Sequence, residues 1–142
     1  MLDLGCPDLS RDPQAIRVVK DEVVRVAFAA APGLVMSAVG PNHYATGDAL
    51  VTGSTGDPWC VSRERFDAKY RPDGGQLHGE PGPYRNVPAP VWAKRIPEPF
   101  RIARSPGGDV LSGAAGDWAL EYAPSDCGLV ARDRFERVYR PA

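Results

Sequence analysis

Apolar and polar residues alternate with a period of two over much of this chain, a pattern that predicts short β-strands. Val24, Val26 and Phe28 would share one face of the first such strand, and Pro32-Gly33 supplies a turn signal after it. Further strands are expected at 34–36, 49–52, 59–61, 91–96, 100–103, 110–111 and 118–122. The pattern indicates a mainly β protein.

Residues 62–70 break this alternation and predict a short helix. Ser62 is placed to cap its N-terminus, and Phe66 and Tyr70 fall one turn apart on one face. Pro72 disfavours helical geometry in the residue before it and ends the helix. One short helix can therefore hold two aromatic rings against a sheet.

The segment from Gly47 to Pro72 occurs twice. It recurs without a gap from Gly116 to Pro141, 69 positions further on (116 − 47 = 69). Ten of the 26 aligned positions are identical, whereas unrelated sequences would share about one or two. The second helix begins with the poorer cap Ala131. The repeat signature consists of Gly47, Asp48, Phe66, Tyr70, Gly116, Asp117, Phe135 and Tyr139.

We therefore predict an α+β, mainly β fold with two tandem repeats of a small antiparallel β unit, each ending in a short helix. A unit this small buries little surface alone, so the two repeats are expected to share an apolar interface and form one pseudo-symmetric body. The predicted divisions are an irregular N-terminal arm at 1–17, repeat 1 at 18–72, a Gly/Pro-rich linker at 73–88 and repeat 2 at 89–142.

Composition narrows the function classes. With Lys+Arg 17 and Asp+Glu 18 among 142 residues, the net charge of −1 offers no field that would attract nucleic acid. No apolar run is long enough to span a membrane, and the first residues lack the pattern of a signal peptide, so a cytoplasmic protein is expected. Three cysteines, Cys6, Cys60 and Cys127, form no CxxC pair, and their odd number favours reduced thiols over a disulfide framework.

The second copy resembles the small bacterial family named for its PGDYG motif, which also has short phage-encoded relatives. The resemblance rests on Gly116-Asp117-Trp118, on the loop Pro124-Ser125-Asp126-Cys127-Gly128, and on the Phe135 and Tyr139 helix. It extends to each repeat. At the motif itself, Ser125 stands where the family has glycine and Cys127 where it has tyrosine. The resemblance implies a shape and no particular chemistry.

Asp48 and Asp117 are one candidate for chemistry. Two carboxylates facing each other across the repeats would suit acid/base hydrolysis. The alternative is that each Gly-Asp pair forms a turn in which the aspartate accepts hydrogen bonds from nearby backbone N–H groups.

Four arginines, Arg63, Arg65, Arg132 and Arg134, are a second candidate. Converging guanidinium groups would bind a phosphate or another anion, and Trp59 and Trp118 would stack on a base or a peptide side chain. The alternatives are solvated helix faces for the arginines and core packing for the tryptophans, Trp92 included.

Metal and thiol chemistry receive little support. His43, His78 and the cysteines match no zinc spacing, and no cofactor motif occurs. Cys60 and Cys127 would need a neighbouring base to act as nucleophiles, and the alternative is an inert thiol. We therefore expect a non-catalytic binding or protein-interaction module. Two hypotheses stay open: a protein that binds nucleotide-like anions between the repeats, and a small hydrolase that uses the paired aspartates.

Overall fold

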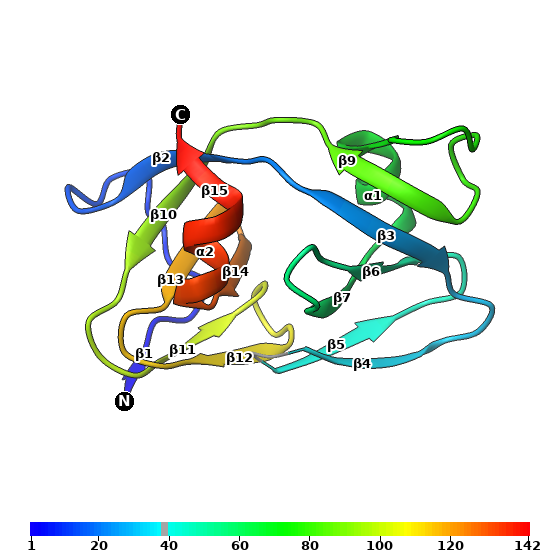
Figure 1. The fold of residues 1–142 in the computed structure, drawn as a ribbon. Coiled ribbons are helices and arrows are strands. Elements are labelled where there is room, and N and C mark those ends of the chain that lie inside the picture. Colours follow the sequence, from blue (N-terminus) through cyan, green and yellow to red (C-terminus); the bar gives the residue numbers. More distant parts are fainter. Residues whose placement is uncertain (38–39) are drawn as a thin grey trace. The chain divides into compact units, whose positions relative to one another are not determined.

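The computed structural model describes residues 1–37 and 40–142 and shows a mainly β protein with two short helices and several antiparallel sheets (Figure 1). The chain divides into two compact units. Residues 21–88 form one of them, which we call the continuous unit. Residues 1–20 and 89–142 form the other, the split unit.

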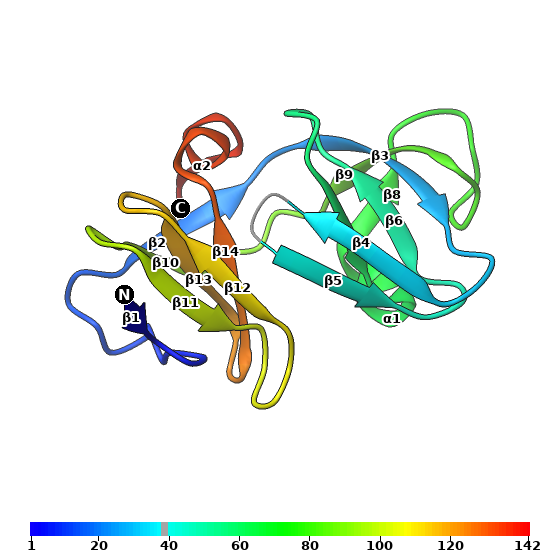
Figure 2. The same cartoon turned by 90° about the horizontal axis from the view of Figure 1, so that it is seen from below.

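The continuous unit is built around one five-stranded antiparallel sheet with the strand order β7-β6-β3-β9-β8. A separate hairpin of β4 and β5 packs against β7 (Figure 2). The elements are β3 (Val23–Phe28), β4 (Gly33–Ser37), β5 (Gly40–Tyr44), β6 (Ala49–Thr52), β7 (Pro58–Val61), α1 (Arg63–Lys69), β8 (Tyr70–Pro72) and β9 (Gly82–Asn86).

The split unit also contains a five-stranded antiparallel sheet, with the order β14-β13-β10-β2-β15. A three-stranded sheet, β1-β11-β12, packs against β14 through β11 and β12. The elements are β1 (Leu2–Asp3), β2 (Ile16–Lys20), β10 (Val91–Arg95), β11 (Phe100–Ala103), β12 (Val110–Gly113), β13 (Trp118–Ala123), β14 (Asp126–Val130), α2 (Arg132–Val138) and β15 (Tyr139–Pro141).

Three strands, β1, β2 and β9, occur where the sequence predicted irregular chain. Residues 82–86 of the predicted linker form β9, which lies between β3 and β8. At the end of the predicted arm, β2 begins at Ile16 and lies between β10 and β15. The prediction of irregular structure is wrong at these residues. Tyr84 is the reason in β9, because its ring is fully buried in the core although Gly82 and Pro83 precede it.

Each helix holds its phenylalanine in a buried aromatic cluster, as predicted. Phe66 stacks on Tyr70 with ring centroids 5.1 Å apart, and Phe135 stacks on Tyr139 at 5.0 Å. The helix starts also follow the prediction. The Ser62 hydroxyl accepts a hydrogen bond from the Arg65 N–H at 3.4 Å, whereas Ala131 supplies no side-chain cap.

A disulfide joins Cys6 to Cys127, so the prediction of reduced thiols is wrong for these two residues. Their Cα atoms lie 5.6 Å apart although 121 positions separate them in the sequence. Cys60, in β7, is a buried thiol outside this disulfide, as the inert-thiol alternative expects. The pairing was missed because the tertiary fold, and no sequence spacing, brings the N-terminal arm onto β14.

No helix in the described part of the chain is long and apolar enough to cross a membrane.

Candidate functional site

Asp48 and Asp117 hold turns against helix starts. The two oxygens of Asp48 accept hydrogen bonds from the backbone N–H groups of Ala45, at 2.8 Å, and Arg63, at 3.1 Å. Those of Asp117 accept from the N–H groups of Ala114 and Arg132, both at 2.9 Å. The predicted turn role of each Gly-Asp pair is confirmed. Both oxygens of each carboxylate are engaged by backbone amides, which leaves the hydrolase hypothesis without geometric support within either unit.

Replacing either aspartate by alanine should lower the free energy of unfolding by about 2 kcal/mol, because two backbone donors lose a charged acceptor. Asparagine, which keeps one acceptor oxygen, should cost about half as much. Urea unfolding of the Asp48→Ala, Asp48→Asn, Asp117→Ala and Asp117→Asn variants measures this. Equal losses for alanine and asparagine would contradict the capping role.

The four candidate arginines are divided between the two units. Arg63 and Arg65 lie on α1 of the continuous unit, and Arg132 and Arg134 lie on α2 of the split unit, so neither unit alone gathers all four. The anion-site hypothesis stays a prediction.

Arg63 and Arg132 have intrahelical partners. Arg63 pairs with Asp67 at 2.9 Å and covers the Phe28 ring, while Arg132 pairs with Glu136 at 3.3 Å. These i, i+4 pairs are the solvated helix faces of the alternative interpretation.

His78 packs against the aromatic core of the continuous unit and contacts Asp67. Its Nε2 atom lies 2.8 Å from an oxygen of Asp67, and its ring lies 5.5 Å from the ring of Phe66. The hydrogen bonds from His78 and Arg63 hold the pKa of Asp67 below its ordinary value. In the described residues, no group of three or more His, Cys, Asp or Glu side chains is arranged to hold a metal ion.

The tryptophans differ in their surroundings. Trp118 stacks on Phe135 at a centroid distance of 3.9 Å and belongs to the core of the split unit, as the packing alternative predicts. Trp92 lies beneath the Arg17 guanidinium, 4.7 Å from its ring centroid. Trp59 packs partly against the core of the continuous unit and also lines a groove.

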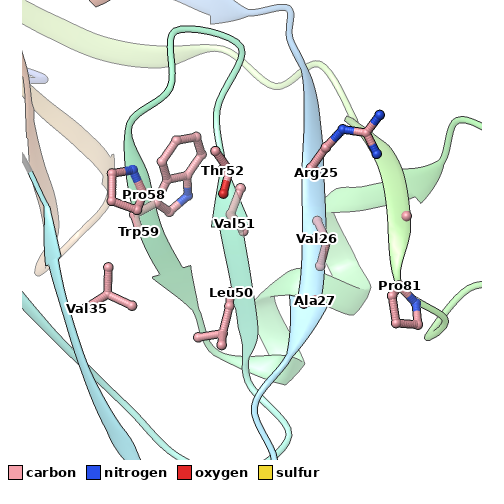
Figure 3. Close-up of a pocket in the computed structure, with 11 residues that line it drawn as sticks. Arg25, Val26, Ala27, Val35, Leu50, Val51, Thr52, Pro58, Trp59 and Pro81 are labelled. Carbon is pink, nitrogen blue, oxygen red and sulfur yellow. The ribbon is translucent and has the colours of Figure 1, made fainter.

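This groove, of about 490 Å³, lies on the sheet of the continuous unit. Leu50 and Thr52 of β6 lie between Pro58 and Trp59 of β7 on one side and Arg25 of β3 on the other (Figure 3). The lining residues are Arg25, Val26, Ala27, Val35, Leu50, Val51, Thr52, Pro58, Trp59, Pro81 and Gly82. One lining residue is charged and most of the others are apolar. The volume falls in the range of ligand-binding pockets.

Among the lining residues, Trp59 was predicted from the sequence as a candidate binding residue. The others were missed because alternating strand residues such as Arg25 and Ala27 are ordinary on the outer face of a sheet. In the alternating pattern of 23–28, the residues between the core positions mark the outer face of the strand. The pattern does not show whether another segment of the chain covers that face.

Within the predicted loop at 124–128, residues 124–125 form a tight hairpin turn closed by the pair Ala123 and Asp126, and the loop prediction is wrong for 126–128, which belong to β14. Ser125 has a φ of +62°, the one non-glycine residue with a positive φ in 1–37 and 40–142. Gly56, at the matching place in the 69-residue offset, has a φ of +87°. The glycine of the family motif therefore suits a left-handed turn position that Ser125 occupies at a cost.

Ser125→Gly should raise the free energy of unfolding by about 0.5–1 kcal/mol, because glycine adopts this backbone conformation without strain. Gly56→Ala is the matched control and should lower the free energy by about 1 kcal/mol, since open space around Gly56 leaves backbone strain as the only cost. Thermal or urea unfolding checks both signs. A destabilised Ser125→Gly variant would contradict the conformational explanation.

Comparison with known protein families gives a match. The model of the PGDYG protein family matches residues 40–140, a continuous stretch that takes in parts of both units. No curated protein and no solved structure matches. Because the family match spans more than half of the 142 residues, and agrees with the resemblance seen in the turn and helix motifs, the chain belongs to the PGDYG protein family.

Proposed function

We propose that this chain is a non-catalytic polypeptide-binding module built from two copies of one β unit. The strand orders support the duplication. In the continuous unit the order is β7-β6-β3-β9-β8, and the elements at the same places in the split unit are β14, β13, β10, β2 and β15. Four of the five pairs follow the order of the chain. The fifth, β9 and β2, is the exception.

The exception is a strand supplied from the opposite end of the sequence. In the continuous unit, β9 follows β8 and pairs with both β8 and β3. In the split unit, β2 from the N-terminal part of the chain takes the matching place and pairs with β15 and β10. The same position in the two sheets is therefore filled from different parts of the sequence.

Hydrogen bonds and side-chain pairs support the same proposal. The Gly47 N–H donates to the Ala29 carbonyl at 2.8 Å, and the Gly116 N–H donates to the Ile96 carbonyl at 2.7 Å. In the smaller hairpins, Gly33 lies opposite Tyr44, and Phe100 lies opposite Gly113. In each pair the aromatic ring packs over the glycine. The glycine comes first in the chain in one hairpin and second in the other, so each pair combines one small and one large residue.

The open groove of the continuous unit is the observation that carries the binding function. It is apolar along most of its lining, it has one cation at its edge, and the outward-facing strand residues Arg25, Ala27 and Thr52 are exposed. Such a surface suits an extended polypeptide, which presents both apolar and polar groups to a sheet. The candidate carboxylates hold turns and take no part in the groove.

Selection of a displayed random-peptide library on the folded chain tests this function. Ala27→Glu places a charged side chain in the groove at an exposed position, and Ala30→Glu makes the same change at an exposed position outside the lining. Selected peptides should lose affinity for the Ala27→Glu variant by about tenfold or more and keep it for Ala30→Glu. Peptides that ignore both variants, or no enrichment at all, would overturn the proposal.

The two other hypotheses of the sequence analysis have their own tests. A nucleotide that raises the melting temperature would support anion binding, since a ligand stabilises the state to which it binds. Turnover of an ester or phosphodiester that disappears in folded Asp117→Asn protein would support the hydrolase.

A further inference from the structure

We propose that the groove of the continuous unit takes an extended peptide segment that carries a leucine-sized apolar side chain and, close to it, a carboxylate. This inference rests on the proposed binding function and names the chemistry of the partner.

In the split unit, the chain's own N-terminal arm covers the sheet face turned away from α2. Leu9 is 3% exposed, and its N–H donates to Oε1 of Glu121 at 3.0 Å. Asp12 forms an ion pair with Nζ of Lys94 at 2.7 Å, and this hydrogen bond is the main cause that lowers the pKa of Asp12. The disulfide of Cys6 fixes the arm on β14. An irregular segment with one apolar and one acidic anchor thus closes this face.

The register of each sheet relates this covered face to the groove. In the split unit, Trp92 lies opposite Glu121. At the matching position in the sheet of the continuous unit, Arg25 lies opposite Thr52. Two residues further along these strands, Lys94 lies opposite Ala119 in the split unit, and Ala27 lies opposite Leu50 in the continuous unit. The outcome differs in exposure. Ala119 is fully buried and Glu121 is 7% exposed, whereas Leu50 and Thr52 at the matching positions are half-buried and exposed, respectively.

The charge of the groove specifies the occupant. Arg25 is its one charged lining residue, and within the described residues its side chain has no hydrogen bond or ion pair. A carboxylate is the group that pairs best with a guanidinium, through two parallel hydrogen bonds. Val35, Leu50 and Pro58 offer an apolar surface beside it, as a leucine-sized side chain requires.

The chain provides a defined probe with this chemistry. A fluorescein-labelled peptide of the sequence at 6–13 carries Leu9 and Asp12 in their natural spacing, and Cys6→Ser in the peptide removes disulfide exchange. Fluorescence anisotropy with the full-length, oxidised chain should show saturable binding. Asp12→Asn in the peptide and Arg25→Gln in the protein should each weaken binding about tenfold, and together by little more than either alone.

Matched variants separate this result from general charge effects. Arg85→Gln removes the same charge from β9, where Arg85 already pairs with Asp21 at 2.8 Å, and should leave the affinity unchanged. No binding of the peptide, or binding insensitive to Arg25→Gln and Asp12→Asn, would overturn the inference.

Other occupants give different results. Library peptides that depend on Ala27 but carry no acidic residue would refute the acidic partner and leave the binding function intact. A dimer in analytical ultracentrifugation that Ala27→Glu converts to monomer would assign the face to a second copy and overturn the peptide proposal.

Discussion

Replacing Cys6 by serine should lower the free energy of unfolding of the split unit by about 3–5 kcal/mol. The disulfide closes a loop with a sequence separation of 121, so its loss frees a large number of unfolded conformations. The arm would then be held by Leu9, the Asp12 ion pair and the strand pairing of β1 and β2.

Urea unfolding with and without a reducing agent measures this effect. The reducing agent should bring the wild type to the stability of Cys6→Ser and leave Cys6→Ser itself unchanged. Thiol titration of the denatured, unreduced chain gives an independent result, because one reactive thiol, that of Cys60, is expected. Three reactive thiols would contradict the pairing. A disulfide persists in oxidising compartments. Cytoplasmic localisation therefore stays a prediction, and this bond argues against it.

Phe66→Ala should lower the free energy of unfolding by about 3–5 kcal/mol, as expected for removal of a large buried ring. Phe66 is fully buried and contacts three aromatic rings in its own core, with centroid distances of 5.4 Å to Phe28, 5.1 Å to Tyr70 and 4.8 Å to Tyr84. Alanine would leave a cavity that these rings cannot fill without moving.

Phe135→Ala is the matched change in the split unit. Phe135 is 7% exposed and stacks on Trp118 and Tyr139, so a loss in the same range is expected. Phe66→Leu, which keeps most of the volume, should cost about 1–2 kcal/mol. Urea unfolding by circular dichroism compares the three variants. A loss below about 1 kcal/mol for either alanine variant would contradict the buried-ring role and weaken the proposed equivalence of the two units.

The local features of the fold could be predicted from the sequence because short-range forces decide them. Ser62, Phe66 and Tyr70 lie within three turns of chain, and capping, side-chain spacing and the following proline were enough to predict α1. The Gly-Asp turns were likewise readable, although the sequence alone could not choose between turn and catalytic roles for Asp48 and Asp117. The hydrogen bonds made that choice.

The sequence by itself therefore determined most of the short strands, the two helices, the positions of the Gly-Asp turns and the membership in the PGDYG family. Only the tertiary structure decided that β2 and β9 complete the sheets, that Cys6 meets Cys127, and that the arm covers one sheet while the groove beside Arg25 stays open. The physical reason is the sequence distance over which each interaction acts. Periodicity and caps act over a few residues, but strand partners, disulfides and covered faces depend on which distant segments meet after the chain has closed on itself.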